Sequence, residues 1–469
     1  MTLSRMQTPT SHGSKDDPFV SPLICKFIFD SKWEDVPSDI RHQLKRALLN
    51  YFAVGFAGAS DPTIDILVST LAPFGANKQA SLIGRKERTD ILNAAALNAM
   101  SSNVFDFDDT HERTVIHPTG PVAAALLAYA QQTPVRGADF MHALLLGIEI
   151  ECRAGNAISP QHYARGWHIT STCGVIGAAL ATGRLLGLTP LQLNWALGSA
   201  INQACGLVET LGTMAKSTSV GNAARNGLLS ALLASRNFSG PAHPLDGPRG
   251  FLNVMGETVD VSCLTNGLGK DWEIAGNSYK PYPCGVVLNP VIEACLELAH
   301  QPSTLELIRS EITAITLTGH PLLRQRTDRP AVQSGRASQV SAQHAVAASL
   351  LRGRAGLNEF SDEAVQDPAL RALGACVCFK DDPTYAIDSA TVTLQFAQHP
   401  EISLHIANAR GSVKYPLSDL EIEKKFLDLS DKQLSKTQAR ALIDAIWNLD
   451  NLTDVSLLMK LAQIPDTQT

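Results

Sequence analysis

The sequence predicts a mainly α fold, in which a large all-helical domain formed by both ends of the chain carries an inserted smaller α+β lid domain. Apolar residues at helical spacing fill most of residues 38–235 and return after Gly411. Between residues 311 and 408, three segments alternate in strand fashion. A chain of 469 residues is also too long for one ordinary core. We predict a disordered tail over 1–22, a helical domain over 23–276 and 412–469, and the lid over 277–411.

The spacing of apolar residues predicts one helix after another in the first half of the chain. Ser38 can cap a helix that buries Ile40, Leu44 and Phe52 on one face, and Pro121 suits the first turn of a later helix. Further helices are expected over 91–105, 137–158, 170–187 and 220–235. Alanine and glycine occur on several faces of these segments, which predicts helices buried on every side and packed closely together.

The strand-like segments are 311–319, 389–397 and 401–408, with a helix expected over 341–353. The last two are separated by the residues QHP, which predicts a β-hairpin. Helices are expected again after Gly411, so the α+β segment interrupts the helical domain.

Composition excludes several classes of protein. Charged residues make up only 18% of the chain, the net charge is −6 and no basic stripe is present, so no nucleic-acid partner is expected. No apolar run is long enough to cross a bilayer, and the first 22 residues lack the apolar core of a secretory signal. Nine scattered cysteines indicate reduced thiols. We expect a cytoplasmic protein without a membrane partner, and the mitochondrial matrix stays open.

An acidic stretch, FDFDDTHERTVIH, precedes the apolar helix that contains Pro121. It could be a metal site, a proton-transfer site or a solvated loop. Its spacing matches no known metal motif, although carboxylates and imidazoles suit divalent ions, so a metal-dependent hydrolase is a minor alternative. A helix terminus would explain Asp109 and Thr110 better than Asp106 and His117, because charge beside buried helices is costly unless it is used or paired. The candidate ligands are Asp106, Asp108, Asp109, His111 and His117.

Three more residues are candidates on chemical grounds. His168 stands at the entry to a helix of small residues, Lys216 in an expected loop before another helix, and Lys280 at the expected domain junction. Each has an ordinary explanation: a core histidine, a solvated lysine and a rigid linker. Together with Asp106 and His117 they indicate an acid–base site for an anion, since lysines neutralise carboxylates and histidine transfers protons near neutral pH.

Four motifs resemble the MmgE/PrpD family in order: FDFDDTH with HPTGPV, GWHITSTCGVIGAALATGRLLGLT, GTMAKSTSVGNAARNGLLSALLA and YKPYPCG. The resemblance extends from about Pro22 to the last helices. It implies a homodimer and cofactor-free chemistry, with no metal, in a cleft between helical domain and lid.

The resemblance also implies roles for individual residues. Lys216 and Lys280 would bind substrate carboxylates, His117 would transfer a proton, Asp106 would orient it and His168 would be a second donor. The chain departs from the family pattern at Ser219, Gly285 and Asn289, where histidine, cysteine or arginine, and histidine are common. His320 is the nearest counterpart of a substrate-binding lid tyrosine.

The function expected from this resemblance is a lyase acting on a small citrate-like di- or tricarboxylate. Dehydration of the 2-methylcitrate kind ranks first. Decarboxylation of cis-aconitate to itaconate and epimerisation of a dicarboxylate are alternatives that use the same residues. A non-catalytic carboxylate-binding dimer is an alternative of another class, in which Ser219 and Asn289 mark a lost activity.

Overall fold

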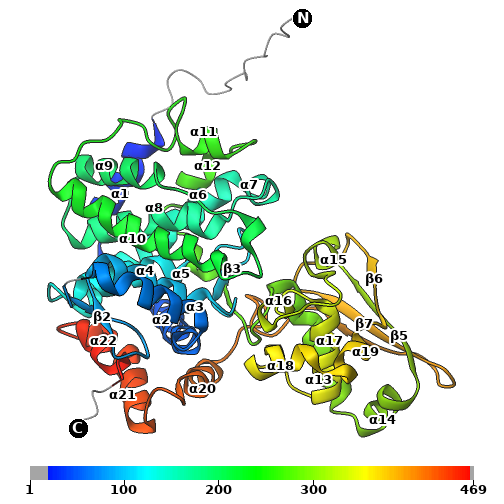
Figure 1. Ribbon diagram of the computed structural model, residues 1–469. Helices are drawn as coiled ribbons and strands as arrows, with labels where there is room; N and C mark the ends of the chain where they lie inside the picture. Colours follow the sequence, from blue (N-terminus) through cyan, green and yellow to red (C-terminus); the bar gives the residue numbers. More distant parts are fainter. Residues whose placement is uncertain (1–18, 76, 465–469) are drawn as a thin grey trace, which may run out of the picture.

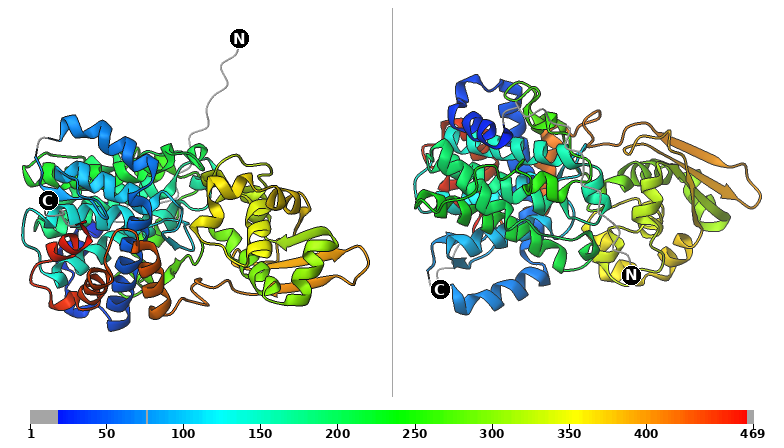
Figure 2. Two further views of the ribbon diagram at one scale, coloured as in Figure 1. Left: turned by 60° about the horizontal axis from the view of Figure 1, so that its bottom comes forward. Right: turned by 90° about the horizontal axis from the view of Figure 1, so that it is seen from above.

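Helices dominate the computed structural model, which describes residues 19–75 and 77–464 (Figure 1). Its buried apolar side chains form two large cores. The first draws on residues 20–279 and 417–462 and the second on residues 284–406. We call the parts around them the helical unit and the α+β unit, and Figure 2 shows them side by side in both views. The mainly α class is therefore confirmed, and both ends of the described chain contribute to the first core.

The helical unit contains two short strands, β1 (Ala80–Ser81) and β2 (Arg88–Thr89), paired antiparallel. Its helices are α1 (Val20–Asp30), α2 (Ser38–Ala59), α3 (Pro62–Leu71), α4 (Ile91–Asn103), α5 (Thr119–Ala130), α6 (Gly137–Ile158), α7 (Gln161–Ala164), α8 (Ile169–Leu185), α9 (Pro190–Ile201), α10 (Ala215–Ser235), α11 (Phe251–Met255), α12 (Ser262–Thr265), α20 (Asp419–Ser430), α21 (Lys436–Trp447) and α22 (Ser456–Ala462).

Small residues bring the central helices close together, as the sequence predicts. Helix α8 packs against α6 and α10, and α10 also packs against α4. A Cβ atom added at Gly147 would lie 2.8 Å from the carbonyl oxygen of Gly177, and one at Gly227 would lie 2.9 Å from that of Val175. The helix backbones therefore approach to a distance that only glycine allows at these positions.

The α+β unit holds a four-stranded sheet in the order β6-β5-β7-β8. The strands are β5 (Ile312–Gly319), β6 (Val377–Asp381), β7 (Ala390–Phe396) and β8 (Ile402–Ile406). Antiparallel β7 and β8 confirm the predicted hairpin, whereas β6, parallel to β5, was not predicted. The helices are α13 (Asn289–Ala299), α14 (Pro302–Ser310), α15 (Pro321–Thr327), α16 (Gly335–Ser338), α17 (Ala342–Arg352), α18 (Asp362–Gln366) and α19 (Pro368–Gly374).

Three local expectations need correction. Ser38 is the first residue of α2 and Pro37 precedes it as N-cap, so Ser38 makes no cap. Lys216 lies in the first turn of α10, not in a loop. The predicted tail over 1–22 falls mostly outside the described residues, but Val20 already begins α1, where its backbone N–H meets Asp246.

The polypeptide passes between the units beside a two-stranded ladder. Strand β3 (Asp109–His111) pairs antiparallel with β4 (Asn277–Tyr279), and Tyr279 packs in the first core. The helical core thus reaches past residue 276, and the domain division over 277–411 stays a prediction. Within the described ranges, no helix combines the length and apolar character needed to cross a bilayer.

Candidate active site

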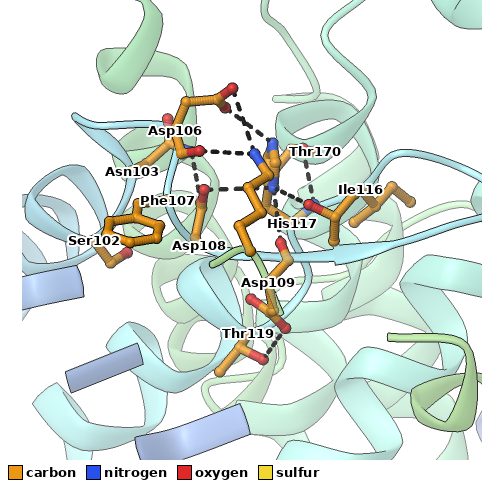
Figure 3. Close-up of polar contacts among 12 residues, drawn as sticks. Ser102, Asn103, Asp106, Phe107, Asp108, Asp109, Ile116, His117, Thr119 and Thr170 are labelled. Atoms are coloured by element: carbon orange, nitrogen blue, oxygen red, sulfur yellow. Dashed lines mark hydrogen bonds and ion pairs between the residues drawn. The ribbon is translucent and has the colours of Figure 1, made fainter. Parts of the chain in front are cut away.

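The acidic stretch forms an irregular segment between α4 and β3. Helix α4 begins at its N-cap Asp90, whose side chain accepts from two backbone N–H groups, and it ends at Asn103. Asp106 then has a φ of 50°, which non-glycine residues seldom adopt. The turn directs Asp106 and Asp108 to the same imidazole, that of His117 (Figure 3).

Asp106 lies at the centre of a cluster of charged groups. Lys216 Nζ donates to its Oδ1 at 2.6 Å, and Lys280 Nζ lies 3.4 Å from its Oδ2. Lys280 also donates to the Asp106 carbonyl oxygen at 2.8 Å. His117 Nε2 is 3.5 Å from Oδ1. The structure therefore brings together four of the residues predicted from sequence, although Lys216 and Lys280 are 110 and 174 positions from Asp106.

The backbone fixes the tautomer of His117. Its Nδ1 lies 2.8 Å from the carbonyl oxygen of Asp109, which can only accept, so Nδ1 carries a proton. Asp108 Oδ1 is 3.4 Å from the same nitrogen. In the neutral ring, the lone pair is then on Nε2, which faces Asp106 and the lysines. The ring is held by Asp108 and Asp109 rather than by Asp106 alone, which refines the predicted orienting role.

His168 occupies the N-cap position of α8 and is linked to the cluster through α10. Its Nδ1 lies 3.1 Å from Ser171 Oγ and 3.3 Å from Ser219 Oγ. Both hydroxyls donate to backbone carbonyls, so each can accept from Nδ1–H. Gly206, with a φ of 129°, lines this pocket, since a Cβ there would lie 2.1 Å from Ser171 Oγ. These contacts place a proton on Nδ1, so that in the neutral ring Nε2 is the acceptor.

Burial and neighbouring charges shift the pKa values of this cluster. Burial raises the pKa of Asp106, but Lys216, Lys280 and His117 outweigh it and hold the pKa well below the usual value. Burial lowers the pKa of His117, and Asp108 opposes it only in part. Burial also lowers the pKa of His168 to about 3. At neutral pH the site therefore combines a carboxylate with two neutral imidazoles.

Burial lowers the pKa of Lys216 as well, but the charges of Asp106 and Asp108 outweigh it, and the net pKa is raised. Lys216 is therefore an ammonium group at neutral pH. An ammonium group beside a carboxylate and an imidazole can stabilise negative charge as it develops on a bound molecule.

A second layer of polar groups supports β3. Asp109 Oδ2 accepts from Thr119 Oγ1 at 2.6 Å and from Asn277 Nδ2 at 2.8 Å. Burial nevertheless raises the pKa of Asp109 to about 7. Its side chain faces away from the cluster and its carbonyl toward His117, so this layer positions the imidazole through the backbone.

Asp106, Asp108 and His117 could also supply three metal ligands, with their ligand atoms within 4.8 Å of one another. The ammonium groups of Lys216 and Lys280 approach the same Asp106 carboxylate. Because these positive charges repel a cation and occupy the carboxylate, the donor set suits an anion better than a metal. Asp109 and His111 take other partners, Thr119 and Thr114 respectively.

A third buried lysine, Lys425, was not among the residues predicted from the sequence. Lys425 Nζ donates to Asn50 Oδ1, to the Phe107 carbonyl and to the Lys280 carbonyl, at 2.8, 2.9 and 2.9 Å. Burial, reinforced by the charge of Lys280, lowers its pKa well below the usual value, while the three acceptors favour the ammonium form. The sequence offered a signal for this residue: Lys425 lies on the same apolar face of α20 as Ile422, and a lysine on such a face is expected to be buried.

The remaining candidates lie apart from the Asp106 cluster. His320 caps α15 by accepting from the Leu322 N–H at 3.1 Å, and no hydrogen bond or ion pair between described residues joins it to the cluster. Asn289 begins α13, where its Oδ1 accepts from the thiol of Cys284. Ser219, in contrast, contacts His168 directly.

A cavity of about 1130 Å³ lies next to this cluster rather than around it. Its lining includes Phe105, Phe107, Met214 and Pro281, which are chain neighbours of Asp106, Lys216 and Lys280. Lys425 also lines it, whereas the side chains of the cluster do not: Asp106, His117, His168, Lys216 and Lys280.

Comparison with known proteins is consistent with this arrangement. The profile of the MmgE/PrpD N-terminal domain matches residues 23–264, and that of the MmgE/PrpD C-terminal domain matches residues 282–451. The fold and the site define a mainly helical protein with a buried cluster of a carboxylate, two imidazoles and two lysines. The chain belongs to the MmgE/PrpD family.

Curated relatives cover nearly the whole chain. A cis-aconitate decarboxylase of Aspergillus terreus is 27% identical over 98% of this chain and 99% of its own. A cis-aconitate decarboxylase-like protein, oryM, of Aspergillus oryzae is 27% identical over 94% and 97%. The human cis-aconitate decarboxylase is 25% identical over 90% of each chain. The chain is therefore an enzyme, a lyase of this family.

Proposed function

We propose that the protein decarboxylates a small unsaturated polycarboxylate of the cis-aconitate type by acid–base chemistry at His117. The observation that carries this proposal is the fixed imidazole, with Nδ1–H on the Asp109 carbonyl and Nε2 beside two buried ammonium groups. Sequence analysis ranked dehydration of a 2-methylcitrate first. The curated relatives carry decarboxylase names, so we rank decarboxylation first and dehydration second.

In the proposed reaction the C–C bond to one carboxylate breaks and carbon dioxide leaves. The electron pair stays on carbon and spreads through the double bond into a neighbouring carboxylate, where Lys216 and Lys280 stabilise the charge. Binding of a polycarboxylate adds negative charge beside His117 and raises its pKa, so that Nε2 takes up a proton from solvent. The imidazolium then delivers this Nε2 proton to carbon and becomes neutral again. Asp108 at 3.4 Å from Nδ1 and Asp106 at 3.5 Å from Nε2 support the imidazolium before transfer.

Asp106 holds the place that a substrate carboxylate would take. Its carboxylate contacts both ammonium groups, so a substrate that binds the lysines must share or displace it. Neutral His168 presents an acceptor Nε2, which cannot bond to an ionised carboxylate. The role of second donor that we propose for His168 therefore requires that it take up a proton when the substrate binds. His320 is kept as a substrate contact only if the α+β unit moves as a lid, a role that we propose for residues 277–411.

A substrate panel in heavy water tests the reaction. Purified protein is incubated with cis-aconitate, 2-methylcitrate, citrate and iminodisuccinate, and products are followed by NMR and carbon dioxide release. We expect carbon dioxide and one deuterium per product from an unsaturated tricarboxylate. Loss of water would identify a dehydratase. Deuterium uptake at carbon without loss of water or carbon dioxide would identify an epimerase. Ligand binding without any of these would favour the non-catalytic carboxylate-binding protein and refute the proposal.

A homodimer is proposed from family membership, and measurement of the molar mass by light scattering tests it. A mass near 50.2 kDa, that of one chain, would contradict the dimer.

A further inference from the structure

The segment that carries Asp106 is held by side chains from distant parts of the chain. Four successive carbonyl oxygens each accept a hydrogen bond from a long polar side chain. The pairs are Arg336 Nη1 with Val104 at 2.6 Å, Gln339 Nε2 with Phe105 at 2.8 Å, Lys280 Nζ with Asp106 at 2.8 Å and Lys425 Nζ with Phe107 at 2.9 Å.

Two of these four donors belong to the α+β unit. Arg336 lies in α16, and Gln339 follows that helix directly. Both reach across to the helical unit, where α4 ends. The other two donors flank the chain crossing, since Lys280 follows β4 and Lys425 lies in α20.

Arg336 is anchored to the helical unit at a second point. Its Nη2 lies 2.8 and 2.9 Å from the two carboxylate oxygens of Asp61, and 3.1 Å from Thr63 Oγ1. The side chains of Arg336 and Asp61 are only 17% and 7% exposed. Removing one partner of such a largely buried ion pair leaves an uncompensated charge, so this contact fixes the guanidinium firmly.

Gln339 is anchored on its own side of the junction. Its carbonyl oxygen accepts from the Gly285 N–H at 3.0 Å, and only 3% of the residue is exposed. Gly285 closes the turn that follows Lys280. The hydrogen bond to Gly285 therefore fixes the position of Gln339 relative to Lys280, the lysine that approaches Asp106.

The backbone at Asp106 needs such support. A φ of 50° in a non-glycine residue is costly and persists only where the surroundings determine it. The side-chain donors on the carbonyls of residues 104–107 supply that constraint, and the resulting turn directs the carboxylate to Lys216 and Lys280.

We propose that Arg336 and Gln339 are positioning residues, through which the α+β unit sets the place of the Asp106 carboxylate. The site then has its full geometry only when both units are docked. This inference rests on the proposed function for its kinetic consequence alone, because its structural consequence is measurable without any substrate.

Amide hydrogen exchange of the full-length protein tests the inference. In Arg336→Met and in Gln339→Met, which removes the amide donor without adding a charge, peptides spanning 104–109 should exchange at least about tenfold faster (a 1.4 kcal/mol change in local opening is a factor of ten). With an accepted substrate, kcat should fall by roughly a hundredfold, the cost of a displacement of about 1 Å, while KM changes less.

Arg352→Met is the matched control. Arg352 also pairs with an aspartate of the α+β unit, Asp367, at 2.9 Å, and it makes no contact with the Asp106 segment. This variant should leave both exchange over 104–109 and kcat unchanged.

Unchanged exchange over 104–109 in the two test variants would overturn the proposal. An equal increase over α13 and α17 would overturn it too, since that pattern means general loosening. If Arg336→Met does not fold, Gln339→Met decides, because it removes one neutral donor and buries no charge. Absence of carbon dioxide release by the wild type would refute the proposed function but leave the exchange result valid.

Discussion

At the scale of residues, the main feature is an imidazole with different partners on its two nitrogens. Nδ1 of His117 is tied to a backbone carbonyl, whereas Nε2 faces a carboxylate that two ammonium groups neutralise. This asymmetry leaves one nitrogen free to exchange a proton with a bound molecule. It depends on the irregular backbone from Asp106 to Asp109.

Replacing His117 tests this feature. We expect His117→Gln to lower kcat by roughly a hundredfold or more with little effect on folding, since general acid–base groups contribute about that much. Steady-state kinetics on the substrate identified in the panel measures the effect. His300→Gln is the control, because His300 is an exposed histidine at the end of α13. Near-normal turnover in His117→Gln would remove this residue from the mechanism.

The neutral state of His168 predicts acid sensitivity. Its folded pKa of about 3 lies below the ordinary 6.5, so the unfolded chain binds a proton between these values and the folded chain does not. Stability therefore falls as pH decreases from 6.5 toward 3, by up to about 1.4 kcal/mol per pH unit from this group. Urea unfolding between pH 4 and 7 should show a shallower pH dependence in His168→Gln. Equal slopes in wild type and variant would mean that His168 is charged in the folded state.

At the scale of elements, the sequence predicted most helices because their apolar spacing is regular. The predicted helix over 137–158 agrees with α6 at both ends. Elements with polar faces were missed. Strand β3 consists of Asp109, Thr110 and His111, and only its partner β4 makes it a strand. Edge strand β6 is only five residues long, and none of them is fully buried. The first turn of α10 buries Lys216 and Ser217, which weakens its apolar pattern.

The close packing of α8 and α10 gives a prediction at this scale. Gly227→Ala would normally favour a helix by about 1 kcal/mol. Here the new Cβ would lie 2.5 Å from Ala178 Cβ, 2.8 Å from Ala179 N and 2.9 Å from Val175 O, and two of these atoms are backbone. We expect a net loss of about 1–3 kcal/mol of stability, the usual cost of overpacking, measured by denaturant unfolding. A higher free energy of unfolding in Gly227→Ala would show that α8 and α10 can move apart at little cost.

At the scale of the whole molecule, the site is built from parts that are remote in sequence. Lys216 and Lys280 reach Asp106 from 110 and 174 positions away. Their motifs could be recognised one by one, but residue spacing contains no information on which side chains meet. Arg336 and Gln339 gave no signal at all, since their role is to donate to backbone carbonyls, and any chain segment offers those.

Ligand binding to this assembled site should stabilise the whole protein. A tricarboxylate held by Lys216 and Lys280 binds only the folded state, and at a hundred times its Kd it adds about 2.7 kcal/mol to the free energy of unfolding. We therefore expect citrate and cis-aconitate to raise Tm in a concentration-dependent manner, and acetate at equal ionic strength to do so far less, because its single negative charge gains less from the two ammonium groups than the three charges of a tricarboxylate do. Lys216→Met should lose most of the shift while Arg352→Met keeps it. An equal shift in Lys216→Met, or with acetate, would place tricarboxylate binding elsewhere on the molecule.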